Sequence, residues 1–297
     1  MLAWSYNLGT MKHAVPGAIS ALLLAVPVWA QEQPPAIATQ APAPVSAVLE
    51  NNGKPMVLPF HCTDQDIQWA GLTCSSDDPC PIYLELSTLA AKGGRLITAG
   101  NLHSAAVTLY TVVLVSADGG QTWREAHERI RGAGLDHIQF LDAETAWISG
   151  LTLFPLPQDP FLLLTTDGGE TWRQRPIAND YHPGTIQQFS FGNRTDGLLF
   201  IDRGPAESGD RYERFASSDG GESWTIQEES TKPLKMPTAE AVPAEWRLRV
   251  DGATQSYHLE RKQGARWNGV ASFAVKVGVC RPEGGELPAP QGLPARP

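Results

Sequence analysis

An eight-residue pattern that occurs three times is the strongest constraint on the fold of this 297-residue chain. SADGGQTW occupies residues 116 to 123, TTDGGETW residues 165 to 172, and SSDGGESW residues 217 to 224. Successive copies of the final Trp are 49 and 52 residues apart. A period of this length indicates an array of similar supersecondary units. Each unit divides into about four short strands separated by turn signals, so the expected fold is all-β.

Each copy has the composition of a hairpin turn. An Asp precedes a Gly-Gly pair, and Asp-Gly is a strong hairpin signal because such a turn needs positive φ. The Asp carboxylate can accept hydrogen bonds from nearby backbone N–H groups, and the preceding Ser or Thr can do so more weakly. The Trp opens the next strand, where its ring can pack on a neighbouring sheet. These structural roles are predicted for Ser116, Asp118, Gly120, Trp123, Thr165, Asp167, Gly169, Trp172, Ser217, Asp219, Gly221 and Trp224.

The pattern resembles the Asp-box, or BNR, repeat: Ser/Thr, any residue, Asp, any residue, Gly, any residue, Thr/Ser, Trp. The resemblance implies a β-propeller-like fold of four to five blades of antiparallel strands, with the box on the turn between the outer two strands of each blade. That family includes sialidases, sortilin-type receptors and photosystem II stability/assembly factors. IQFLDAETAWISG and FSFGNRTDGLLFID look like the inner strand pairs of the assembly-factor group. Because one fold hosts many functions, the box does not imply an activity.

Composition divides the chain into four segments. Residues 1 to 30 carry one positive charge and an apolar run that ends in Trp-Ala, which is typical of a cleaved signal peptide. Residues 31 to 54 are rich in Pro and Ala and predict a disordered linker. Residues 55 to 281 form the expected Asp-box domain, and residues 282 to 297 a disordered tail.

Charge and the signal peptide restrict the partners. Cleavage after residue 30 would leave 22 basic and 32 acidic residues, a balance that argues against nucleic acid. The apolar run of the signal is short and is interrupted by Pro27, so no transmembrane segment is expected in the mature chain. A secreted or periplasmic protein that binds an unknown protein or glycan is expected.

Four cysteines follow the signal peptide, and an even number in an oxidising compartment argues for two disulfides. The spacing is unlike that of paired zinc knuckles, so no metal site is expected. Three connectivities are possible. We favour Cys74 with Cys80, and Cys62 with Cys280, because the second bond would join the first and last strands of the domain.

Weaker repeats leave the number of blades open. ERKQGARW, residues 260 to 267, keeps only the Gly and the Trp of the box, and PMVLPF and DIQWAG near the start of the domain have no box. We interpret the first as a degenerate (worn) fourth repeat and the other two as a closing strand or a partial blade. An incomplete ring that forms a homo-oligomer is the alternative to a closed one.

No catalytic motif is found. HERIR at residues 127 to 131 lacks the second His of HExxH, and there is no nucleophile elbow or phosphate loop. The Arg-Ile-Pro motif of sialidases is missing, because Arg129-Ile130 is followed by Arg131, and Tyr110 and the other tyrosines are interpreted as strand or loop residues. No cofactor, catalytic residue or metal ligand is therefore predicted, and the arginines that follow the boxes are interpreted as solvated.

The binding residues are not identified by sequence. Three insertions are the most suitable places for a ligand, residues 75 to 81, 153 to 160 and 179 to 184, because binding residues concentrate in loops held by a rigid scaffold. We expect an exported, non-catalytic binding or assembly module. A sialidase-like glycoside hydrolase is the alternative, and a purely structural module is a third possibility. A deep pocket with three arginines and paired acids would favour the enzyme, and a flat aromatic face the binding module.

Overall fold

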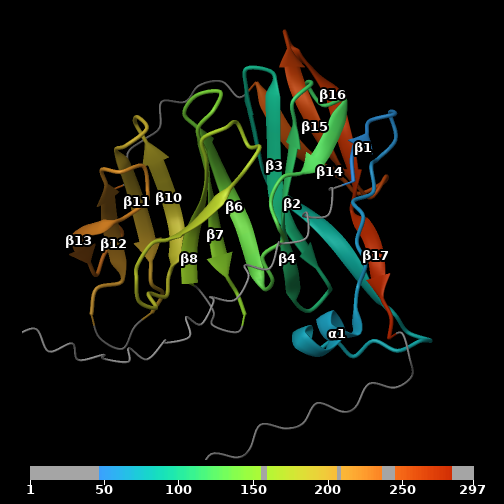
Figure 1. The fold of residues 1–297 in the computed structure, drawn as a ribbon, viewed down its shortest axis with the longest axis horizontal. Helices are drawn as coiled ribbons and strands as arrows, with labels where there is room; N and C mark the ends of the chain where they lie inside the picture. The colour runs from blue at the N-terminus through green and yellow to red at the C-terminus, as the bar shows by residue number, and fades with distance from the viewer. Residues whose placement is uncertain (1–46, 155–158, 206–208, 236–244, 283–297) are drawn as a thin grey trace, which may run out of the picture. The chain divides into compact units, whose positions relative to one another are not determined.

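The computed structural model describes residues 47–154, 159–205, 209–235 and 245–282 (Figure 1). The expected signal peptide, residues 31 to 46 of the expected linker and residues 283 to 297 of the expected tail lie outside them. The described residues belong to one unit, 45 to 297, and form four antiparallel sheets and one α-helix. The prediction of an all-β, propeller-like fold is confirmed, with four sheets in the described residues.

Each sheet is built mainly from strands that follow one another in the chain. The first blade has the order β1-β5-β4-β3-β2-β17, with β1 (Leu49–Glu50), β2 (Cys80–Lys92), β3 (Arg95–His103), β4 (Thr108–Ser116), β5 (Thr122–Glu125) and β17 (Lys276–Cys280). The second blade is β6 (Ala133–Phe140), β7 (Ala146–Thr152), β8 (Asp159–Thr165) and β9 (Arg173–Pro176). The third blade is β10 (Thr185–Phe191), β11 (Gly197–Asp202), β12 (Tyr212–Ser217) and β13 (Thr225–Ser230). The last sheet is β14 (Trp246–Asp251), β15 (Ser256–Gln263) and β16 (Arg266–Ala274).

Three hydrophobic cores hold neighbouring sheets together. One joins the last sheet to the first blade, a second joins the first and second blades, and a third joins the second and third blades. The second blade is therefore covered on both faces, which explains why its strand β8 is buried along FLLLT without alternation. In contrast, β13 at the edge of the third blade is exposed along nearly its whole length. Within the described residues, no core cluster joins the third blade to the last sheet.

The hairpin turns predicted at the three boxes are present, and they share one hydrogen-bond pattern. In the first, the Ser116 hydroxyl donates to Asp118 Oδ1 at 2.8 Å and accepts from the Gly120 N–H at 2.8 Å. Asp118 Oδ2 accepts from the Thr122 hydroxyl at 2.6 Å. The two glycines of each box have positive φ, from 72° to 96°. The Asp side chain therefore supplies acceptors for a backbone that only glycine adopts without strain.

Each box Trp packs against the preceding sheet of the stack. Trp123 is 1% exposed, and its ring meets that of Phe273 on β16 edge to face, with centroids 5.3 Å apart. Trp172 lies in the core between the first and second blades. Trp224 is half-buried against the core between the second and third blades, and its ring also meets that of Phe191 in its own blade edge to face at 5.8 Å. Trp267 of the worn repeat differs, because Arg247 stacks over its ring at 4.4 Å and the Asp-box hydrogen bonds have no counterpart in the β15–β16 turn.

The arginines after the boxes are in contact with solvent, and each of them also forms an ion pair with a Glu of the next blade. In the second and third boxes the residue after Gly-Gly is a Glu, which binds arginines of the preceding blade. The pairs are Arg95–Glu170, Arg124–Glu170, Arg173–Glu222 and Arg175–Glu222. The first box has Gln121 at this position, and Thr225 follows the third box where the first two have Arg. These ion pairs therefore link only the three box-containing blades.

Two disulfides join Cys62 to Cys280 and Cys74 to Cys80, the pairing that the sequence favours. Cys280 on β17 lies opposite Cys80 on β2 in the register of the first blade. Cys62 and Cys74 lie on either side of the helix α1 (Asp64–Ala70). Both bonds therefore attach the segment that contains α1 to one edge of the first blade.

Two segments near the start of the domain differ from expectation. Residues 66 to 71, expected in a strand or partial blade, belong to α1 and its C-cap Gly71. Thr63 and Asp66 form a capping box, and this reciprocal bonding satisfies N–H groups at the helix N-terminus. Residues 49 and 50, expected in the linker, pair as β1 with β5, and the Asn51 side chain donates to Val270 O at 2.7 Å. The ordered domain thus begins before the predicted boundary at residue 55.

We expect the carboxylate of a box Asp to stabilise the fold less in acid than at neutral pH. The hydroxyl and backbone N–H of Ser223 hold the pKa of Asp219 at about 2, below its ordinary value of 3.8. A carboxyl whose pKa is lower in the folded state stabilises that state above its unfolded pKa and loses this effect as pH falls through the folded pKa. We expect the difference in urea midpoint between wild type and Asp219→Asn to be constant above pH 5 and to shrink between about pH 4 and pH 2. An Asp77→Asn control in an exposed loop should stay close to wild type throughout. A difference for Asp219→Asn that is independent of pH would contradict this role.

Candidate functional site

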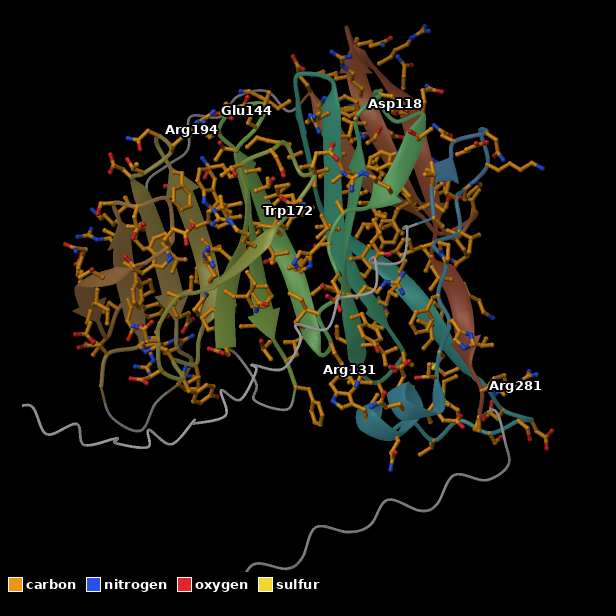
Figure 2. The ribbon with its side chains drawn as sticks, in the orientation of Figure 1. Asp118, Arg131, Glu144, Trp172, Arg194 and Arg281 are labelled. Atoms are coloured by element: carbon orange, nitrogen blue, oxygen red, sulfur yellow. A yellow bond between two sulfur atoms is a disulfide. The ribbon has the colours of Figure 1, made fainter. Side chains whose placement is uncertain are left out.

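The box turns and the loops of interest lie at opposite ends of the strands. When the strands of the first blade are counted from β2 to β5, the box of each of the three blades joins the third and fourth strands, and the turn between the first and second strands lies at the same end. The connection between the second and third strands and the crossover to the next blade lie at the other end, called the loop end here. Figure 2 shows Arg131 beside α1, away from Asp118, Glu144 and Arg194.

At the loop end, α1, β4 and the crossover from β5 to β6 bring three polar side chains together. The Tyr110 hydroxyl donates a short hydrogen bond to Asp66 Oδ1. Arg131 Nη2 donates to the same oxygen at 3.2 Å and to the Tyr110 oxygen at 3.1 Å. Asp66 Oδ2 accepts from the N–H and hydroxyl of Thr63 at 3.0 and 2.8 Å. Four donors therefore surround a carboxylate that is only 3% exposed.

The electrostatics of this cluster fix its protonation at neutral pH. Burial alone would raise the pKa of Asp66, but the hydrogen bonds from Tyr110 and Thr63 and the charge of Arg131 lower it below its ordinary value. Burial and the hydrogen bond to Asp66 raise the pKa of Tyr110. The hydrogen bond with Tyr110 raises the pKa of Arg131. The cluster therefore holds a carboxylate, a neutral phenol and a guanidinium.

Aromatic side chains form one wall of the site. The Arg131 guanidinium lies 5.3 Å from the ring centre of Trp69, and that ring meets Phe154 edge to face at 5.2 Å. Gly132, with φ of 65°, lies beneath Trp69, and its carbonyl accepts from the N–H groups of Leu153 and Phe154 at 2.7 and 3.1 Å. A Cβ at Gly132 would lie 2.6 Å from the Phe154 oxygen and 2.8 Å from the Trp69 ring. Glycine thus permits the close approach that places both rings.

This arrangement leaves large apolar side chains in contact with solvent. Leu153 and Phe154 are 40% and 43% exposed, and Trp69 is half-buried. Together with the polar cluster they form what we call the loop-end site, which consists of Asp66, Trp69, Tyr110, Arg131, Leu153 and Phe154.

A second cluster at the loop end of the third blade is structural. Glu213 is 1% exposed; its carboxylate lies 2.6 Å from His182 Nε2 and 3.2 Å from Arg203 Nη1. The His182 ring also packs edge to face on Phe215. These contacts attach the loop of residues 179 to 184 to its own blade.

The three predicted insertions therefore have different roles. Residues 75 to 81 include most of the loop closed by the Cys74–Cys80 bond, and residues 179 to 184 pack on the third blade. Only Leu153 and Phe154, at the start of the second insertion, join the loop-end site; residues 155 to 158 lie outside the described part of the chain. The remaining members of the site were not predicted to bind a ligand, although the Thr63–Asp66 spacing contains a signal for the helix that places two of them.

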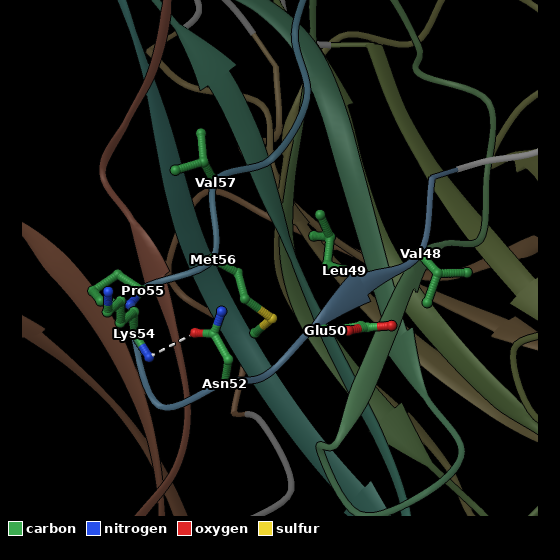
Figure 3. Close-up of a pocket in the computed structure, with 8 residues that line it drawn as sticks. All are labelled: Val48, Leu49, Glu50, Asn52, Lys54, Pro55, Met56 and Val57. Carbon is green, nitrogen blue, oxygen red and sulfur yellow. Dashed lines mark hydrogen bonds between the residues drawn. The ribbon is translucent and has the colours of Figure 1, made fainter.

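A cavity of about 470 Å³ lies elsewhere, along residues 48 to 57 (Figure 3). It is lined by a single chain segment, in which the Lys54 N–H donates to Asn52 Oδ1 at 3.1 Å. Its lining lacks paired carboxylates, His and aromatic rings, so it has no recognisable catalytic constellation. The described residues contain no group of three or more His, Cys, Asp or Glu suited to a metal ion. Among the same residues, no helix is long and apolar enough to cross a membrane.

Comparison with known proteins yields distant structural similarities. No protein-family model and no curated protein matches the chain. Solved structures that match include YCF48 bound to a D1 peptide, with 17% identity, a TM-score of 0.34, and coverage of 64% of this chain and 53% of that one. YCF48 from Cyanidioschyzon merolae has 14% identity, a TM-score of 0.32 and coverage of 64% and 51%. An α-L-arabinanase of Penicillium chrysogenum complexed with arabinobiose has 14% identity, a TM-score of 0.32 and coverage of 75% and 66%. The match thus spans about half the length of the YCF48 chains. At these values the function has to be argued from the site itself.

Proposed function

We propose that this chain is an exported, non-catalytic binding module that recognises another protein, or a component of the cell envelope, through its loop-end site. The observation that carries the proposal is the exposure of Phe154 beside Trp69 and Arg131, with the exposed Leu153 preceding Phe154 in the chain. Aromatic side chains and arginine are enriched at protein interfaces, and they dominate binding energies there. The apolar run of residues 1 to 30 and the two disulfides support export, because disulfides persist in oxidising compartments.

The chemistry of the polar cluster argues against the alternative, a sialidase-like hydrolase. A tyrosine nucleophile needs a neighbouring base to take its proton. Tyr110 has a raised pKa, and its neighbour Asp66 has a lowered pKa and already accepts four hydrogen bonds. Asp66 is thus a poor base, and its burial keeps its carboxylate away from a substrate.

We therefore expect no turnover of fluorogenic sialosides or of a panel of other glycosides by the purified chain. The measurement is release of the fluorophore, with an active sialidase as positive control. Turnover that persists through repurification and is lost in Tyr110→Phe would contradict the non-catalytic assignment.

The binding role is tested by comparing variants of the site with a variant at the opposite end. Chain immobilised on beads is incubated with cell-envelope extract, and retained proteins are quantified by mass spectrometry. We expect a partner retained by wild type and by Arg194→Ala, which changes an exposed residue at the box end, but not by Trp69→Ala/Phe154→Ala. Circular dichroism melts establish that each variant is folded. Retention that is equal for all three chains would show that the loop-end site is not the binding surface.

A further inference from the structure

The loop-end site has hydrogen-bond donors available for a ligand, but its acceptors are already used. Asp66 accepts two hydrogen bonds on each carboxylate oxygen, from Thr63, Tyr110 and Arg131. A carboxylate has about four acceptor positions, so none remains for a ligand. Asp66 is also buried, and it cannot be approached from solvent.

The unused groups of the site are donors. Arg131 uses Nε and Nη2 within the cluster, while Nη1 has no hydrogen-bond partner in the described residues. The indole N–H of Trp69 likewise has none there. The Arg131 side chain is 34% exposed, so the ligand meets the guanidinium and not the carboxylate beneath it. The nearby Arg129 is different, because Glu125 and the Pro59 carbonyl already accept from it.

The free donors and occupied acceptors of the site distinguish between sugars and carboxylates as ligands. Sugar hydroxyls donate as well as accept, and no free side-chain acceptor is present in the site to receive their donors. A carboxylate only accepts, and it matches a guanidinium with charge-assisted bonds. The exposed Leu153 and Phe154 in turn require an apolar group. The distances from Arg131 to Trp69, 5.3 Å, and from Trp69 to Phe154, 5.2 Å, are short enough for neighbouring residues of one extended segment to reach both parts.

Resting on the proposed binding function, we infer that the partner is a peptide segment with an acidic side chain within about three residues of a large apolar one. The acidic group binds Arg131 Nη1, and the apolar side chain lies against Phe154 and the edge of Trp69.

The test is selection of a random peptide library, displayed on phage, against the immobilised chain. Selected peptides should contain Asp or Glu within about three residues of Phe, Trp, Tyr, Leu or Met. For a selected synthetic peptide, Arg131→Gln should weaken binding about ten- to hundredfold, the size expected for a charge-assisted hydrogen bond. Replacing the peptide's Glu by Gln should weaken binding to wild type to a similar extent, with little further loss in Arg131→Gln.

Matched controls keep the outcomes distinct. Arg129→Gln, which alters a guanidinium that is already bonded, should bind the peptide like wild type. Arg131→Lys, which retains the charge, should recover part of the affinity and guards against a folding defect in Arg131→Gln. Enriched peptides without an acid, an unchanged affinity in folded Arg131→Gln, or binding of neutral oligosaccharides at this site would overturn the inference while leaving a binding function in place. Failure to enrich any peptide, together with no loss of envelope-protein retention in Trp69→Ala/Phe154→Ala, would contradict the proposed function itself.

Discussion

Replacing Trp123 with alanine is expected to lower the free energy of unfolding by about 3–5 kcal/mol, the usual cost of removing a large aromatic side chain from a core. Trp123 is 1% exposed, lies at the interface between the first blade and the last sheet, and meets Phe273 edge to face. Its indole N–H also donates to the Gly120 carbonyl at 3.2 Å, so the ring ties its own turn to the neighbouring sheet. Equilibrium urea unfolding followed by circular dichroism measures the change.

Phe154→Ala is the matched control, because Phe154 is 43% exposed and contributes to the loop-end site. It should change the free energy of unfolding by no more than about 1 kcal/mol, in the range of substitutions outside the core. The same pair of variants should behave in the opposite way in peptide binding. A Trp123→Ala chain of unchanged stability would show that the box Trp does not hold the sheets together.

The box turns could be predicted because their hydrogen bonds and backbone conformation depend only on residues within the box. Asp118 bonds to residues within four positions, and the paired glycines need only positive φ, so sequence spacing determines the turn. Helix α1 could not be predicted, for a different reason. The hydrophobic run around Ile67 is too short to distinguish strand from helix by periodicity. The capping residues Thr63 and Gly71 are the signals for a helix in this segment. They enclose only seven residues, which is short for an isolated helix.

The candidate site could not be predicted because its contacts join residues that are far apart in the sequence. Tyr110 meets Asp66 across 44 residues, and Arg131 meets Asp66 across 65. Each of these residues is unremarkable within its own segment, and only the docking of α1 on the end of the first blade brings them together. The ion pairs between blades had a clearer signal, since Glu follows Gly-Gly in the second and third boxes and Arg follows the Trp in the first and second. The complementarity lies between successive boxes and not within any one of them.

The two disulfides should differ in their contribution to stability. The Cys62–Cys280 bond spans 218 residues, and the Cys74–Cys80 bond spans 6. In the chain-entropy description, a cross-link stabilises by restricting the unfolded chain, and the effect grows with the logarithm of the loop length. We expect Cys62→Ala/Cys280→Ala to lower the free energy of unfolding by about 5 kcal/mol and Cys74→Ala/Cys80→Ala by about 2 kcal/mol.

Guanidinium chloride unfolding of the two double variants under identical conditions measures this difference, and each variant serves as the control for the other. Both bonds attach the segment around α1 to the β2–β17 edge of the first blade, so a local effect on that segment is common to both. The loop length is what distinguishes the two bonds, because only the longer bond closes a loop of 218 residues, from Cys62 to Cys280, in the unfolded chain. Equal losses of stability would therefore show that the bonds act on the local attachment of α1 and not on the ends of the domain. A larger loss in Cys62→Ala/Cys280→Ala would show that this bond also acts by restricting the unfolded chain between residues 62 and 280.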